Sequence, residues 1–194
     1  MKLTVRTNPT AGQLDRRSFL KISTLATAAC LLPPLIPRRL FAGLSPDRHL
    51  GFFNSRTDEK LYVTYCAKNR YIPEALEEID YILRDYRTGE IKPIDPALLN
   101  YLYAISRSLK LTAKHPFHII SGYRSPKTNA RLRRRNRGVA KNSYHTKGKA
   151  IDIRLARYRT STLRRAAARL QMGGVGYYPR SHFVHIDTGK VRSW

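Results

Sequence analysis

Acidic residues are scarce in this sequence. Its 194 residues include 13 Asp and Glu against 37 Lys and Arg, which gives a formal net charge of +24 at pH 7. A charge of this sign and size favours anionic partners, such as nucleic acid, anionic lipid or an acidic wall polymer, although a simple effect on solubility is equally consistent with it. Hydrophobic residues still make up 42% of the chain, which suffices for one core and excludes a disordered tail.

Cysteines and long apolar runs are also scarce. The apolar run at 22–32 has about eleven residues, whereas a helix that spans a bilayer needs roughly 20. Paired Arg16 and Arg17, a Phe-Leu step and a lysine precede this run, which is typical of a twin-arginine export signal. A cytosolic amphipathic helix is the alternative, but the run has no polar face.

The length of the chain predicts one domain with an extra terminal segment. We expect residues 1–42 to be a twin-arginine signal peptide that directs the protein to the periplasm, so that it contacts the membrane only through this signal. Cleavage after Ala42 and retention as an anchor both fit. After cleavage Cys66 would be the one remaining cysteine, which excludes an internal disulfide. Residues 43–70 are predicted as a linker and N-terminal hairpin, and residues 71–194 as the main domain.

Hydrophobic spacing and helix-start residues predict an α+β fold, with a small antiparallel sheet and helices packed on one face. The segments at 50–54 and 60–65 flank a polar stretch, as the strands of a hairpin do. Further strands are predicted at 117–120, 150–155, 173–178 and 183–187, and helices at 73–86, 96–109, from 126 onward and at 161–171. No internal repeat is present.

Three polar residues stand out on the predicted strands and the loop between them. The segment 143–152 (SYHTKGKAID) places His145 on a loop and Asp152 on the strand that follows. Isoleucines flank Asp152 and point to one face of that strand, so Asp152 points to the other. The same alternation directs His185 to the polar face of the last strand. If the two strands are neighbours, His145 can close over them.

Two imidazoles and one carboxylate are the ligand count of a catalytic zinc site, which keeps one position open for water. Zinc lowers the pKa of that water to about 7 and polarises a carbonyl under attack. Spacing alone, however, leaves the choice open between a metal site and ordinary packed histidines with a surface carboxylate.

Four ordered motifs carry a resemblance to a known family. They are SGYRS at 121–125, the segment 143–152, GGVGYYPR at 173–180 and HFVHID at 182–187. With these motifs the sequence, from about residue 70 to its C-terminal tryptophan, resembles the murein endopeptidase MepK family. That family lies within the wider group of lysostaphin, D-Ala-D-Ala peptidase and Hedgehog-type (LAS/Hedgehog-type) zinc folds.

The resemblance implies a role for several residues. It implies that His145, Asp152 and His185 bind Zn²⁺ in a zinc peptidase domain at 71–194. The implied reaction is hydrolysis of amide bonds in peptidoglycan peptide crosslinks, with a preference for diaminopimelate–diaminopimelate crosslinks. It also places Arg124 by the scissile carbonyl, where a guanidinium stabilises an oxyanion or binds a substrate carboxylate. A salt bridge that holds the loop is the alternative for Arg124.

One position departs from the wider fold. Many relatives carry a glutamate three residues before the last zinc histidine, where it acts as the general base, and here that position is His182. The ordinary pKa of histidine suits proton transfer, so we expect His182 to take this role, with a supporting position or simple exposure as alternatives. Asp187, on the same strand face as His185, is expected either to orient that imidazole or to face solvent.

Two other functions compete with the peptidase. The Hedgehog branch retains zinc for recognition, so a non-catalytic zinc-containing wall-binding module is the first alternative. A nucleic-acid binder is the second, because residues 131–137 include five arginines. This run lacks interleaved aromatic residues and follows an export signal, so we expect no nucleic acid but a wall-binding or solvated helical face. The expected partner is peptidoglycan, whose peptide stems are rich in carboxylates. Nothing in the sequence indicates the oligomeric state.

Overall fold

The structure is a computed structural model that describes residues 46–112, 115–136 and 138–194. These residues belong to one compact unit. The predicted signal peptide at 1–42 lies outside the described residues. In the part of the chain that is described, no helix combines the length and the apolar character needed to cross a membrane.

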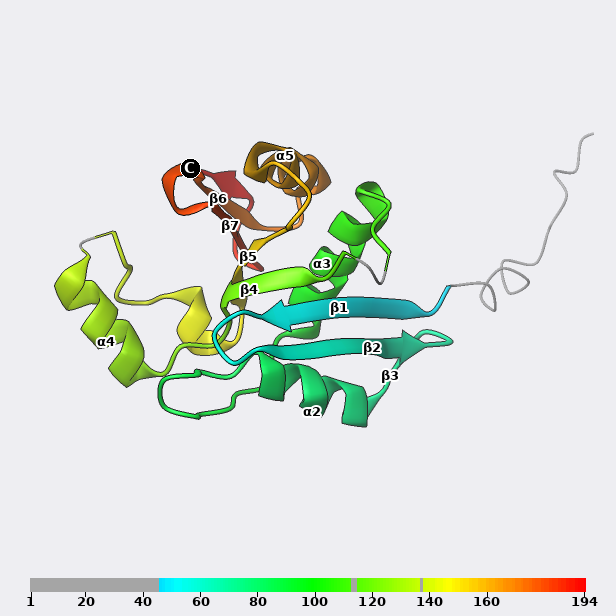
Figure 1. The fold of residues 1–194 in the computed structure, drawn as a ribbon, viewed down its shortest axis with the longest axis horizontal. Coiled ribbons are helices and arrows are strands. Elements are labelled where there is room, and N and C mark those ends of the chain that lie inside the picture. Colours follow the sequence, from blue (N-terminus) through cyan, green and yellow to red (C-terminus); the bar gives the residue numbers. More distant parts are fainter. Residues whose placement is uncertain (1–45, 113–114, 137) are drawn as a thin grey trace, which may run out of the picture. The chain divides into compact units, whose positions relative to one another are not determined.

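An eight-stranded sheet with the order β3-β2-β1-β4-β5-β7-β6-β8 forms the centre of the fold (Figure 1). Its strands are β1 (Arg48–Asn54), β2 (Glu59–Ala67), β3 (Arg70–Tyr71), β4 (Phe117–Ser121), β5 (Ala150–Arg154), β6 (Gly174–Tyr178), β7 (Phe183–Asp187) and β8 (Arg192–Ser193). The α+β class is therefore confirmed, and the hairpin predicted within 43–70 belongs to the same sheet as the strands that follow.

The sheet is mixed, so the prediction of a small antiparallel sheet was wrong. β1 pairs with β4 in parallel, and β6 pairs with β8 in parallel, while the other pairs are antiparallel. Between β1 and β4 the chain runs through two further strands and two helices. A connection of this length lets a strand return in the same direction as its neighbour, which a tight hairpin cannot do.

Within the described residues, four α-helices accompany the sheet: α2 (Pro73–Ile82), α3 (Pro96–Ser108), α4 (Pro126–Arg135) and α5 (Thr160–Leu170). The first three begin with proline, which suits the first helical position because its missing N–H has no partner there in any case. α2 ends four residues before the predicted end at 86. The chain turns there instead, since the backbone N–H groups of Thr88 and Gly89 both bond to the carbonyl of Asp85.

Three of the helices share one hydrophobic core with the sheet. β1 buries alternate residues, including Leu50 and Phe52, and β5 adds Ile151 and Ile153. α3 and α5 also meet each other, because the hydroxyl of the buried Tyr101 donates to a carbonyl in α5 at 3.0 Å. α4 contributes no residue to this core and lies beside the sheet (Figure 1).

Candidate metal centre

Asp152 and His185 are direct neighbours across two strands. β5 and β7 pair antiparallel, and in this register Asp152 lies opposite His185. Both side chains therefore project from the same face, as the alternation predicts. The core residues Ile151 and Ile153 occupy the other face of β5. This confirms that the two polar strand residues share one side of neighbouring strands.

His145 reaches the same place from a short 3-10 helix, η2 (Tyr144–Lys147). The side chain of Ser143 caps this helix by accepting from the backbone N–H of His145, and Gly148 ends it with a φ of 67°. A Cβ on residue 148 would also come within 2.3 Å of the carbonyl oxygen of Pro93, so only glycine fits this turn. The turn holds His145 over the strands, with the residue 1% exposed.

The three side chains bring one ligand atom each to a common point. Nε2 of His145 lies 3.2 Å from Oδ1 of Asp152 and 3.2 Å from Nδ1 of His185. The distance between Oδ1 of Asp152 and Nδ1 of His185 is 2.8 Å. Ligands bound to a tetrahedral metal ion at about 2.1 Å are separated by about 3.4 Å. The observed spacing is slightly smaller, and small side-chain shifts would accommodate an ion.

The outer hydrogen bonds fix which ring nitrogens face the cluster. Nδ1 of His145 lies 2.8 Å from the carbonyl oxygen of Gly122, and Nε2 of His185 lies 3.0 Å from Oδ2 of Asp187. Both partners only accept, so these nitrogens carry the protons and the neutral rings turn their lone pairs to the cluster. Two lone pairs and a carboxylate oxygen then face one another, an arrangement that a bound cation would stabilise. The donor set fits a divalent metal ion. Of the two alternatives for Asp187, the structure shows the one in which the carboxylate is buried and bonds to His185.

The electrostatics of the cluster follow from burial and mutual contact. Burial raises the pKa of Asp152, but His145, His185 and Arg124 outweigh this effect and hold that pKa well below its ordinary value. Burial dominates for His145 and lowers its pKa, which favours the neutral, metal-binding form. Burial also acts to lower the pKa of His185, but Asp152 and Asp187 raise it overall. The carboxylate is thus charged at neutral pH.

Arg124 also reaches the cluster, as the sequence predicts. Its backbone N–H bonds to the carbonyl of His145 at 3.3 Å, and its Nε donates to Oγ of Ser121 at 2.8 Å. One terminal nitrogen then forms an ion pair with Asp152 and lies 3.0 Å from Nε2 of His145. Arg124 therefore contributes a fixed positive charge at the edge of the cluster. The alternative role predicted for Arg124 was a salt bridge that holds its loop. Such a salt bridge is present, and its partner is the candidate metal ligand Asp152.

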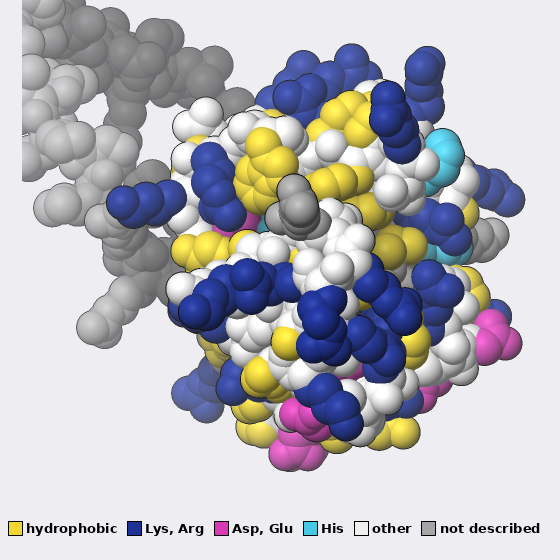
Figure 2. Space-filling model, turned by 90° about the vertical axis from the view of Figure 1, so that its left-hand side faces the viewer, with side chains coloured by type: hydrophobic (Ala, Val, Ile, Leu, Met, Phe, Trp, Pro, Cys, Tyr) yellow, Lys and Arg dark blue, Asp and Glu magenta, His cyan; other side chains and the backbone are white. Residues whose placement is uncertain are grey.

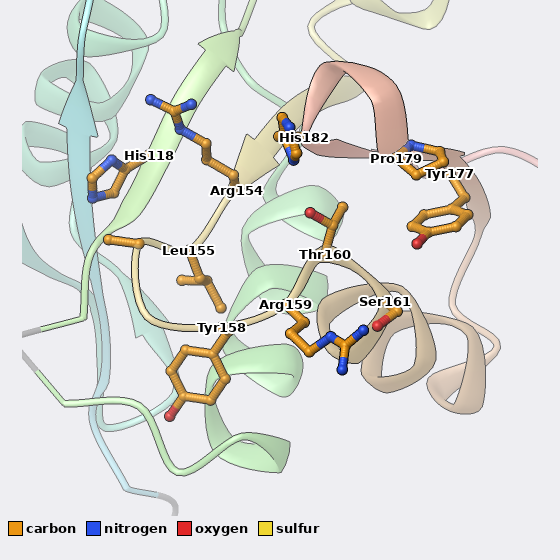
Figure 3. Close-up of a pocket in the computed structure, with 11 residues that line it drawn as sticks. His118, Arg154, Leu155, Tyr158, Arg159, Thr160, Ser161, Tyr177, Pro179 and His182 are labelled. Atoms are coloured by element: carbon orange, nitrogen blue, oxygen red, sulfur yellow. The ribbon is translucent and has the colours of Figure 1, made fainter.

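His182, by contrast, does not lie with the cluster. It follows the short 3-10 helix η3 (Pro179–Ser181) with a φ of 53° and is exposed. Its neighbours Ser181 and Phe183 line the cleft that contains the cluster, whereas His182 lines a different pocket beside the N-terminus of α5 (Figure 3). The turn between β6 and β7 directs consecutive residues to opposite sides, so this geometry gives no support to proton transfer by His182.

Two C-terminal residues of the site were not predicted from the sequence. The cluster lies in a cleft of about 640 Å³ whose lining includes Arg192 and Trp194. The Trp194 ring centroid is 5.4 Å from that of His185, and Nε1 of Trp194 donates to the Tyr178 hydroxyl at 3.0 Å. A signal for this arrangement does exist in the glycines of β6. A Cβ at Gly176 would lie 2.8 Å from the Trp194 ring, so the tail can pack there only against glycine.

An α+β chain that brings two histidines and an aspartate together beside an arginine has a side-chain set that fits a metallopeptidase. Comparison with known proteins identifies the family. The model of the peptidoglycan L,D-endopeptidase MepK family matches residues 44–194, and the chain belongs to this family. It is 44% identical to peptidoglycan L,D-endopeptidase MepK of Escherichia coli (strain K12) over 182 residues, which cover 93% of this chain and 97% of the relative.

A second relative comes from another organism. The chain is 40% identical to the probable peptidoglycan L,D-endopeptidase MepK of Haemophilus influenzae over 180 residues, which cover 93% of this chain and 95% of the relative. No solved structure matches this chain. The resemblance that the four sequence motifs indicate is thus confirmed at the level of the family.

Proposed function

We propose that this protein is a zinc-dependent murein endopeptidase that hydrolyses amide bonds in peptidoglycan peptide crosslinks. The observation that carries the proposal is the convergence of Nε2 of His145, Oδ1 of Asp152 and Nδ1 of His185. Membership of the MepK family supports the reaction, because the relatives are named as peptidoglycan endopeptidases.

The residues of the cleft have separate roles in this reaction. His145, Asp152 and His185 would hold the zinc ion, and Asp187 and the Gly122 carbonyl keep both imidazoles in the required orientation. When bound, zinc supplies a Lewis acid that activates water and polarises the scissile carbonyl. Arg124 donates to the oxygen on which negative charge develops, from a guanidinium already fixed by Ser121.

The composition of the cleft supports an anionic peptide substrate. Arg124 and Arg192 both line it, and Asp152 is the one carboxylate among the described lining residues. Tyr178 and Phe183 stack with their ring centroids 4.5 Å apart and form an apolar wall for aliphatic side chains. We propose diaminopimelate–diaminopimelate crosslinks as the preferred substrate, since each such residue presents a carboxylate beside an alkyl chain.

The face that carries α4 supports binding to a polyanion. Lys and Arg side chains predominate on this face, and Asp and Glu are few (Figure 2). Arg131, Arg133, Arg134 and Arg135 of α4 are all exposed, and the loop after α4 lines the cleft. We propose that α4 is a wall-binding surface that holds the polymer near the reacting bond.

The cellular location is proposed from the N-terminal residues. Arg16, Arg17 and the apolar run at 22–32 support export by the twin-arginine pathway to the periplasm. The family match begins at residue 44, one residue beyond the mature start predicted at Gly43. N-terminal sequencing of the protein from a periplasmic extract is the test. An intact leader on protein confined to the cytoplasm would contradict the proposal.

Digestion of purified sacculi tests the reaction. The zinc-loaded protein is expected to remove crosslinked dimers from the muropeptide profile, and a chelator or the His145→Ala substitution is expected to prevent this. Persistence of all crosslinked dimers with fully loaded protein would contradict the proposal. Binding of zinc and sacculi without cleavage would select the non-catalytic wall-binding module.

A further inference from the structure

A second pocket lies on the other side of the β6–β7 turn from the cleft. It has a volume of about 610 Å³ and is lined by residues of β4, of β5 and the loop after it, of the start of α5, and of the β6–β7 turn. We call it the α5 pocket. The turn is a shared wall, because Tyr178, Ser181 and Phe183 line the cleft while Pro179 and His182 line the α5 pocket.

The charged lining of the α5 pocket is entirely basic. Its lining includes Arg154, Arg159, His118 and His182 and no Asp or Glu (Figure 3). In Figure 3, Arg154 lies on one side of the pocket and Arg159 on the other. Neither arginine forms an ion pair within the described part of the chain. Two exposed arginines and two histidines with no acidic residue in the lining make this pocket a surface that favours an anion.

The start of α5 adds hydrogen-bond donors to the same pocket. α5 has eleven residues, its cap residue Arg159 makes no side-chain capping bond, and its first turn holds no acidic residue. The hydroxyls of Thr160 and Ser161 line the pocket beside the free N-terminal amides. The positive end of a helix and its unused N–H groups both favour an anion.

The remaining walls are apolar. Leu155, Tyr158 and Tyr177 line the α5 pocket, and Arg164 stacks on the Tyr177 ring with its guanidinium carbon 5.4 Å from the ring centroid. Arg164 itself does not line the pocket, so the cations of the lining are Arg154 and Arg159. The pocket thus offers cations above an apolar surface. A carboxylate at the end of an aliphatic chain matches both features.

We propose that the α5 pocket binds a carboxylate of a peptidoglycan peptide stem, as a second contact for the crosslinked substrate whose scissile bond lies in the cleft. This inference rests on the proposed function for the identity of the polymer. The two pockets flank one turn, so a branched, crosslinked peptide can reach both while a single short stem reaches one.

A pair of double variants tests the α5 pocket. R154A/R159A removes the two lining arginines, and R165A/R169A removes two exposed arginines of α5 that do not line the pocket. With a soluble crosslinked muropeptide dimer as substrate, R154A/R159A is expected to raise KM by about tenfold and to change kcat by less than about twofold, because charge-assisted bonds contribute to binding. Its zinc content should match that of the parent. Equal KM values for the two double variants would overturn the proposal.

His182 gives a second test on the same wall. If it contributes to the α5 pocket, His182→Ala raises KM by about threefold and leaves kcat nearly unchanged, since an exposed imidazole makes one weak contact. If it transfers the proton, kcat falls and KM does not. The second result would overturn its assignment to this pocket.

Direct binding separates this inference from the proposed function. Calorimetry of the crosslinked dimer with chelator-treated protein needs no hydrolysis, so it works even if the protein proves inactive. R154A/R159A is expected to bind this probe about tenfold more weakly than R165A/R169A does, and a muropeptide with amidated carboxylates should bind both variants alike. Equal affinity of both variants for the charged probe would overturn the inference. Inactive parent protein that still shows the difference would contradict only the peptidase.

Discussion

The cleft and the α5 pocket are both basic, but they hold their charges in opposite ways. In the cleft, each charged group is fixed by another: Arg124 pairs with Asp152, and His185 bonds to both Asp152 and Asp187. In the α5 pocket, Arg154 and Arg159 have no described ionic partner. A network of fixed groups suits chemistry, which needs preorganised positions, whereas unpaired surface cations suit binding.

Removal of a metal ligand from the cleft should have the largest effect on zinc binding and hydrolysis. His145→Ala deletes one of three ligand atoms and the bond to the Gly122 carbonyl, so zinc binding and hydrolysis should both be lost. The loss should exceed the roughly 10–100-fold cost of removing a group that only supports a ligand. Zinc content and muropeptide release are the measurements. His115→Ala is the matched control, because His115 lies outside the cleft. Retained zinc and activity in His145→Ala would contradict the assignment.

Removal of the supporting carboxylate should have the next largest effect. Asp187 accepts from Nε2 of His185 and pairs with Arg192. Asp187→Asn keeps the shape but weakens the orientation of the imidazole, and we expect a loss of about 10–100-fold in zinc affinity. Competition with a chelator measures it. Asp58→Asn, at an exposed turn with a φ of 60°, is the control. Unchanged zinc affinity would show that His185 needs no such support.

Removal of the C-terminal side chain should have a smaller effect. Trp194→Ala deletes a wall of the cleft and the bond to the Tyr178 hydroxyl. An aromatic contact of this kind contributes about 1 kcal/mol, so kcat/KM should fall by about fivefold to tenfold while zinc content stays constant. Trp194→Phe should recover most of the loss, because it restores the ring. Equal losses in both variants would assign the effect to the indole N–H alone.

The buried carboxylate behind the Arg124 loop should affect stability more than activity. Asp85 is 1% exposed and accepts from the backbone N–H of Ser125 and of Arg87. Burial acts to raise its pKa, but these bonds and Thr128 lower it overall. A lowered folded pKa means that the stabilisation is present above the unfolded pKa of about 3.9 and is lost as pH falls through the folded value.

Asp85→Asn should therefore lower the free energy of unfolding by about 1–3 kcal/mol at pH 7 and flatten its dependence on pH below about 4. Denaturant titrations over a pH series measure both effects. Asp47→Asn, an exposed carboxylate, is the control. A variant that loses the same free energy at every pH would show that charge is not the cause.

The alternation of side chains along a strand predicted those features of the site that depend only on nearby residues. The facing of Asp152 and His185 follows from a period of two, and η2 ends at Gly148 as the expected turn. The side to which His182 points could not be predicted, because a left-handed backbone at a residue other than glycine leaves no mark in the spacing. The parallel pairing of β1 with β4 and the packing of Trp194 depend on residues far apart in the chain. Periodicity within a segment cannot encode such contacts.

The backbone of Trp194 is held to β6 by two hydrogen bonds, since its carbonyl accepts from the N–H of Tyr177 and its own N–H donates to the carbonyl of Val175. Any polypeptide fused after this residue would therefore start at the rim of the cleft. A C-terminal polyhistidine tag would bring competing imidazoles to a zinc ligand set and obstruct incoming polymer. Affinity handles for purification are better placed ahead of β1, and assays that use C-terminally tagged protein should underestimate turnover and count zinc bound by the tag as zinc bound by the site.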